Sequence, residues 1–160
     1  DKNINSKTYE VLREENDYRK SYWYFKKRYI TYPIYKYQIY KLIDKNNKLK
    51  GLGVLRIVNI NGNKCIRIID WIGKLVFFKY FTNFCYDLAF KINGEFVDLY
   101  CSGIPINILK NTGLHKVTKK EIIPNHLSPL KYENIDISFV SDDSKKLIFF
   151  RGDCDQDRPN

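Results

Sequence analysis

Asp70 is the residue with the clearest potential for acid–base chemistry. It lies near the end of an almost continuously apolar stretch, Cys65 to Ile72, whose β-branched composition is typical of a buried strand. Burial disfavours a charged carboxylate and so raises its pKa, and a carboxylate of raised pKa can act as the base that deprotonates an amine. The competing interpretation is a carboxylate held in a hydrogen-bond network with a purely structural role.

Cys101 and Ser102 end a second short apolar stretch, Phe96 to Cys101. A thiol or hydroxyl at the end of a buried strand can act as an acid or as a nucleophile. The sequence supplies no partner base beside them, so a buried cysteine without a chemical role is the alternative for Cys101.

Three carboxylates alternate near the end of the chain, at Asp153, Asp155 and Asp157, and Arg158 follows them. Arg158 stands where a calcium-binding loop of this spacing requires glycine, so we expect no metal. The four residues suit a polar or aminated substrate; equally, Arg158 could pair with the carboxylates and fix the chain end. Arg28 could contact a phosphate at the mouth of a cleft or lie on a solvated helix face.

The composition predicts one domain, residues 1–160, and a cytoplasmic protein. The formal charge of +10 favours polyanions, but lysine-rich composition together with abundant Ile, Asn and Tyr is the bias of a low-GC genome, so nucleic acid is not the expected partner. The four cysteines show no paired short spacing, which is typical of a reducing compartment. No apolar run reaches the roughly 20 residues of a membrane helix, so we expect no membrane insertion.

The first half of the chain predicts a helix followed by three antiparallel strands. A helix is expected from Ser6 to Tyr29, with Pro33 preventing its continuation. Asn61-Gly62 is a strong hairpin signal, because both central positions of a type I′ turn need positive φ. The expected strands are Ile34 to Leu42, Gly51 to Ile60 and Lys64 to Ile72.

The second half predicts a βαβ unit. Apolar residues recur at helical spacing from Val76 to Lys91, and Phe96 to Cys101 is expected to be a strand parallel to the one that ends at Ile72. Ligands of such sheets usually bind at the carboxyl ends of the strands. The remaining expected elements are a short helix after Pro105, a short strand from Thr118 to Glu121, a loop from Pro124 to Asn134, and a hairpin formed by Ile135 to Val140 and Lys146 to Phe150. The fold class is therefore α/β with a mixed sheet of α+β character.

This order of elements and several local motifs resemble the GNAT acetyltransferase superfamily. The closest likeness is to a GNAT-like branch often associated with polysaccharide or cell-envelope gene clusters. The chain lacks counterparts of the first strand and first helix of that fold, which implies the C-terminal part of a longer protein with another GNAT-like half, or a homo-oligomer partner. The resembling motifs are Lys27-Arg28-Tyr29, Tyr32-Pro33, Ile68 to Gly73, Ile123 to His126, Asn134-Ile135-Asp136 and, most specifically, Gly152 to Asn160.

The resemblance implies an N-acyltransferase that passes an acetyl or similar group from acyl-CoA to an amine of an amino sugar or envelope precursor. Asp70 would be the base, strand amides near Ile72 would hold the carbonyl oxygen, and the amides of Gly73, Lys74, Leu75 and Val76 would hold the cofactor's pyrophosphate. The substrate set would comprise Arg28, Asp153, Asp155, Asp157 and Arg158.

Two alternatives remain open. The family's phosphate loop usually has two spaced glycines, whereas Gly73 is followed here by bulky residues. Leu109 stands where the family often has a tyrosine that acts as the general acid and protonates the departing thiolate. These differences favour a non-catalytic GNAT-like half that binds substrate or a partner domain. The other alternative is a Fem-type aminoacyl-transferase half that uses charged tRNA. An open space between the parallel strands would favour acyl transfer, and a space filled by Trp71, Phe77 or Phe78 would favour the non-catalytic half.

Overall fold

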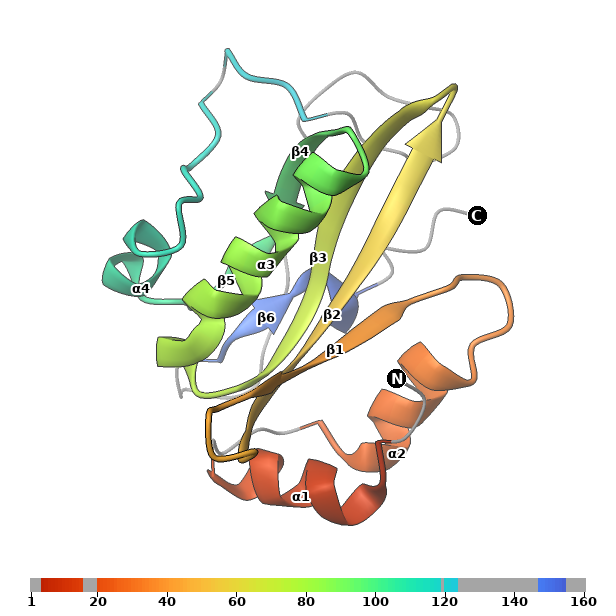
Figure 1. Cartoon of the computed structure of the whole chain (residues 1–160), viewed down its shortest axis with the longest axis vertical. Helices are drawn as coiled ribbons and strands as arrows, with labels where there is room; N and C mark the ends of the chain where they lie inside the picture. Colours follow the sequence, from red (N-terminus) through yellow and green to blue (C-terminus); the bar gives the residue numbers. More distant parts are fainter. Residues whose placement is uncertain (1–3, 16–19, 119, 124–146, 155–160) are drawn as a thin grey trace.

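The computed structural model contains one four-stranded mixed sheet with helices on both faces (Figure 1). It describes residues 4–15, 20–118, 120–123 and 147–154, to which all structural statements refer. The strand order is β1-β2-β3-β4, with antiparallel pairs except for the parallel pair β3 and β4. The predicted mixed α/β class is confirmed at this level.

The expected single N-terminal helix is wrong. The structure has α1 (Ser6–Glu15) and a separate short α2 (Tyr22–Phe25), which continues as a π-helical turn, η1 (Lys26–Ile30). Ser21 has extended backbone angles, and its side chain accepts a hydrogen bond from the amide of Tyr24. A serine in this position satisfies an amide that has no partner inside the helix, so it starts a new helix. The preceding Lys20 therefore lies outside both helices.

The predicted meander is confirmed, with shifted strand ends. Its strands are β1 (Gln38–Ile43), β2 (Leu49–Ile60) and β3 (Asn63–Gly73). Asn61 and Gly62 have φ values of 53° and 91°, as a type I′ turn requires. The pairing of β2 with β3 contains one irregularity: Val54 lies opposite Asp70 and Leu55 opposite Ile68, which leaves Ile69 as an extra residue. This is a β-bulge, and it changes which face the following side chains occupy.

The predicted βαβ unit is also confirmed. A 3-10 turn, η2 (Leu75–Phe77), leads into α3 (Phe78–Lys91), which returns the chain to β4 (Gly94–Leu99). β4 pairs with β3 in parallel from Lys64–Gly94 to Ile68–Leu99, and β3 continues beyond the last of these pairs. The ends of the two strands therefore separate at the bulge.

The C-terminal part adds small elements beside the separating strands. β5 (Cys101–Ser102) pairs antiparallel with β6 (Phe149–Phe150), and η3 (Arg151–Asp153) follows. The expected short helix is α4 (Ile106–Lys110). The expected strand at Thr118 to Glu121 is wrong: the described residues there form a turn in which the amide of Glu121 donates to the carbonyl of Thr118. The predicted loop 124–134 and strand 135–140 lie outside the described residues.

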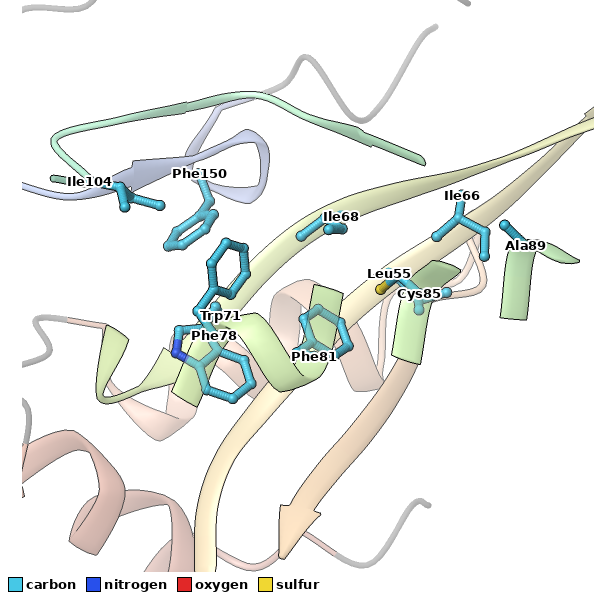
Figure 2. Close-up of a cluster of buried hydrophobic side chains, with 10 residues drawn as sticks. All are labelled: Leu55, Ile66, Ile68, Trp71, Phe78, Phe81, Cys85, Ala89, Ile104 and Phe150. Atoms are coloured by element: carbon cyan, nitrogen blue, oxygen red, sulfur yellow. The ribbon is translucent and has the colours of Figure 1, made fainter. Parts of the chain in front are cut away.

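Two hydrophobic clusters cover the two faces of the sheet. The α3 face is built from aromatic and aliphatic side chains around Trp71, Phe78 and Phe81 (Figure 2). The other face packs against α1 and α2 and includes Tyr9 and Phe25. Because neighbouring strand residues point to opposite faces, adjacent Val54 and Leu55 belong to different clusters. None of the helices in the described ranges combines the length and apolar character that crossing a bilayer requires.

Candidate functional site

Asp70 is completely buried on the face covered by α1 and α2, and both of its carboxylate oxygens are hydrogen-bonded. Oδ2 accepts from the Tyr29 hydroxyl at 2.7 Å and from Lys20 Nζ at 2.6 Å. Oδ1 accepts from the backbone amide of Trp71 at 2.9 Å. This agrees with the network interpretation, and a base role for Asp70 would require Lys20 to move away.

The Lys20 ammonium lies between two carboxylates. Its Nζ is 2.6 Å from Asp70 Oδ2 and 2.5 Å from Asp153 Oδ1. The side chains of Lys20 and Asp153 are 12% and 13% exposed, whereas that of Asp70 is not exposed at all. We call Lys20, Tyr29, Asp70 and Asp153 the ammonium centre. It is buried at Asp70 and reaches the surface at Lys20 and Asp153.

The bulge in β3 determines why Asp70 faces these partners. Ile68 packs in the cluster under α3, while Ile69 packs in the cluster under α1 and α2. Asp70 bonds to Tyr29 and Lys20 on that second face, so two successive residues are directed to the same side. Regular alternation after Ile68 would have directed Asp70 into the aromatic cluster, which offers a carboxylate no comparable partners.

Asp153 is brought to the centre by a closely packed C-terminal turn. Its other oxygen accepts from the amide of Phe150 at 2.8 Å, and the Tyr24 hydroxyl donates to the carbonyl of Gly152 at 3.0 Å. A Cβ at Gly152 would lie 2.1 Å from the Tyr29 hydroxyl oxygen and 3.0 Å from the carbonyl oxygen of Ile69, so this position has no room for a side chain. Arg28 donates to the carbonyl of Cys154. Thus two predicted substrate residues meet at the C-terminal turn: Asp153 belongs to it, and Arg28 of η1 binds its end.

Burial and charge act in opposite directions on the groups of the ammonium centre. Burial lowers the pKa of Lys20, but the carboxylates of Asp70 and Asp153 outweigh burial, so the net pKa is raised. Burial and then the charge of Asp70 raise the pKa of Asp153, against the opposing effect of Lys20. Burial and then Asp70 raise the pKa of Tyr29 well above its usual value, so its hydroxyl remains a donor. A cluster of shifted groups that reaches the surface is a candidate functional site.

The predicted cofactor stretch lies at the junction of β3 and α3. Ile72 is fully buried in the cluster under α1 and α2, whereas Lys74 and Val76 are exposed and Leu75 is half-buried. Gly73 has a φ of 146°, and a Cβ there would approach the Lys50 carbonyl oxygen to 2.6 Å. The glycine is therefore required by the close approach of β2, which explains its presence without a cofactor.

The space between the separating strands is filled by aromatic side chains. Phe78 lies between Trp71 and Phe150, at ring-centroid distances of 5.8 Å and 5.9 Å, and Ile104 completes the group (Figure 2). Trp71 and Phe78 are fully buried. The residues present here do not fit the pantetheine arm of acyl-CoA.

Cys101 is half-buried in β5, opposite Phe150. Burial raises the pKa of its thiol to about 11, so the thiol stays protonated at neutral pH and is a poor nucleophile. Asp155, Asp157 and Arg158 lie outside the described residues.

Lys20 is the member of the ammonium centre that carries no sequence signal, since it is one of many lysines in a charged segment. Tyr29 belongs to the Lys27-Arg28-Tyr29 motif, so that motif contained a usable signal. Its role became visible when the fold placed Tyr29 against Asp70.

A second buried ionic group lies on the same face. Arg151 Nη2 donates to Asp98 Oδ2 at 3.1 Å, and Arg67 Nε lies 3.4 Å from the same oxygen. All three side chains are at least nine-tenths buried. The Arg151 guanidinium also stacks on the Tyr100 ring, with its central carbon 3.9 Å from the ring centroid. This group attaches the C-terminal turn to β3 and β4.

Comparison of the chain with protein-family models, with curated proteins and with solved structures gave no significant match.

Proposed function

We propose that this chain is a GNAT-like binding half that holds the amine of an amino sugar or cell-envelope precursor for a separate catalytic half. The observation that carries the proposal is the position of Lys20 Nζ between Asp70 and Asp153. A ligand ammonium has the same charge and the same three donors as a lysine side chain. It can therefore replace Lys20 between the two carboxylates. The resemblance to the GNAT superfamily supports the reaction class, and the contacts of Lys20 Nζ with Asp70 and Asp153 support an amine as the bound group.

The ammonium centre suits a replaceable occupant. Lys20 lies between α1 and α2 and outside both helices, so its side chain can leave without unwinding either of them. Asp70 is held in place by Tyr29 and the Trp71 amide, and Asp153 by the Phe150 amide. Both carboxylates therefore keep their positions when the ammonium between them changes. The raised pKa of Asp153 also makes it a better proton acceptor than an exposed aspartate.

A rescue experiment tests this proposal. Lys20→Ala removes the internal ammonium and leaves two carboxylates beside an unfilled space. We expect butylamine and glucosamine to raise the unfolding temperature of Lys20→Ala at pH 7, whereas 1-butanol and glucose at equal concentrations have no such effect. Wild type should respond less, because Lys20 competes for the same place.

Two further variants make the rescue specific. Lys20→Met fills much of the space with an uncharged chain and should show little rescue. Asp153→Asn combined with Lys20→Ala removes one carboxylate charge and should weaken rescue by amines. Equal stabilisation of all variants by amines, or no stabilisation of Lys20→Ala, would contradict an ammonium site.

Acyl-CoA-dependent N-acyl transfer by this chain itself is the second candidate function. The separation of β3 from β4 after the Ile68–Leu99 pair favours it, because the family resemblance predicts a cofactor opening there. Phe150 and Phe78 occupy that region, so this candidate requires them to move. Calorimetric titration with acetyl-CoA and desulfo-CoA tests it, with Phe150→Ala as the variant that enlarges the space. Saturable binding by wild type would support the transferase. Absence of binding by both wild type and Phe150→Ala would contradict it and favour the GNAT-like binding half.

A further inference from the structure

Apolar side chains project from the outer side of α3, away from the sheet. Tyr80 and Phe90 are 50% and 90% exposed, and Val76, in the turn before the helix, is 56% exposed. Tyr80 is followed by exposed Asn83, Asp87 and Phe90 at steps of three or four residues, so these side chains lie along one side of the helix. Figure 1 shows α3 in front of the sheet with no described element over it. We call these five residues the outer stripe.

Lysines flank the outer stripe. Lys74 precedes the turn, Lys79 lies in the first turn of α3, and Lys91 is its last residue. The Lys79 ammonium lies 5.0 Å from the centroid of the Tyr80 ring. None of the three lysines forms an ion pair with a residue that the structure describes. Asp87 is the one carboxylate in α3, so three lysines against one carboxylate give this surface a surplus of positive charge.

This pattern suits the surface of a lipid bilayer. The outer stripe is a row of separate side chains on a convex helix and extends over about 20 Å, so a protein partner would need a matching concave surface. A bilayer interface adapts to such a row, because aromatic side chains lie among the head groups and lysines attract anionic lipids. A second copy of this chain is a poorer occupant, since symmetric pairing would bring the same lysines together.

We infer that the outer stripe and its three lysines form a docking surface for membranes that contain anionic phospholipids. The helix lies along the plane of the bilayer, with Tyr80 and Phe90 at the level of the head groups. The contact is peripheral and needs no membrane-spanning segment. The ammonium centre lies on the opposite face of the sheet and uses different residues, so this inference does not depend on the proposed function.

Co-sedimentation with lipid vesicles tests the inference. Vesicles of phosphatidylcholine with about one-third phosphatidylglycerol, at about 0.1 M salt, should bind wild type much more strongly than vesicles of phosphatidylcholine alone. Lys79→Gln combined with Lys91→Gln should weaken this binding about 25-fold, because each lysine near an anionic surface contributes about fivefold. Phe90→Ala should weaken it about tenfold, since it removes a ring that the interface covers.

Two matched controls lie on the other face of the sheet. Trp23→Ala removes an exposed ring from α2, and Lys26→Gln combined with Lys27→Gln removes two exposed charges from η1. Both controls should bind within about twofold of wild type, because charges beyond a Debye length from the bilayer are screened by salt.

Three results would overturn the inference. Equal weakening by the two pairs of lysine substitutions would mean that only the net charge of the chain attracts the vesicles. Absence of binding to the anionic vesicles would exclude the membrane as occupant, and dimerisation that is lost in Phe90→Ala would assign the stripe to a second copy. A measurement on wild type avoids any folding defect of the variants: in bicelles that contain spin-labelled phosphatidylglycerol, the amide resonance of Phe90 should broaden more than that of Trp23, and the reverse order would contradict docking through α3.

Discussion

The two faces of the sheet bury different kinds of side chain. The α3 face is filled by aromatic rings, such as Trp71 and Phe81, stacked at 5.6 Å. The other face contains a comparable apolar cluster but also buries charged groups, among them Asp70, Asp98 and Arg151. Apolar packing gains stability in proportion to buried area, whereas a buried ion pair recovers little more than its desolvation penalty. We therefore expect a buried side chain of the α3 face to contribute more to the free energy of unfolding than a buried charged side chain of the opposite face.

The largest expected effect comes from the aromatic face. Trp71→Ala removes a fully buried ring that contacts Phe78 and Phe81 and donates its indole N–H to the Gly73 carbonyl. We expect the free energy of unfolding to fall by about 3–5 kcal/mol. Chemical denaturation measures it. Trp23→Ala is the matched control, because Trp23 is 68% exposed, and its effect should stay below about 0.5 kcal/mol.

A smaller loss is expected on the charged face. Lys20→Ala removes the ammonium between Asp70 and Asp153 and leaves their charges close together. Breaking a fully buried pair costs about 3–5 kcal/mol, and partial exposure of Lys20 reduces the expected loss to about 2 kcal/mol. Denaturation at pH 7 measures it. A loss as large as that of Trp71→Ala would contradict the expected difference between the two faces.

A loss of stability about half that of Lys20→Ala is expected at the start of α2. Ser21→Ala removes the hydroxyl that accepts from the Tyr24 amide, and loss of such a cap costs about 1 kcal/mol. Ser21→Asp restores an acceptor and should retain most of the stability. If alanine and aspartate behave alike in denaturation experiments, the serine does not act as a cap.

The smallest effect is a pH dependence at the alkaline end. The pKa of Lys20 is raised in the folded chain, so its contribution is fully present below the unfolded value of about 10.4 and is lost as pH rises through the folded value. The stability difference between wild type and Lys20→Met should therefore be constant from neutral pH to about pH 10 and then decrease. Denaturation at several pH values measures this difference. A difference that grows with pH would contradict the ion pairing of Lys20.

Much of the fold follows from short-range signals. The Asn61-Gly62 turn adopts the predicted positive φ values, and the helical spacing between the two apolar strands produced the parallel pair that was expected. The error in the N-terminal helix has a local cause, because Ser21 can sit inside a helix or cap one. Packing of the Tyr22 and Phe25 rings against Tyr9 favours the capped arrangement here.

The sequence by itself determined the strands, the hairpin turn and the crossover, because periodicity and turn residues act over a few positions. The tertiary structure decided what Asp70 does. One extra residue, Ile69, directs Asp70 to the α1 and α2 face, where Lys20, fifty positions away, and Tyr29 bond to it. Such contacts depend on how whole elements pack and on a single bulge in strand register, and neither leaves a periodic signal in the chain.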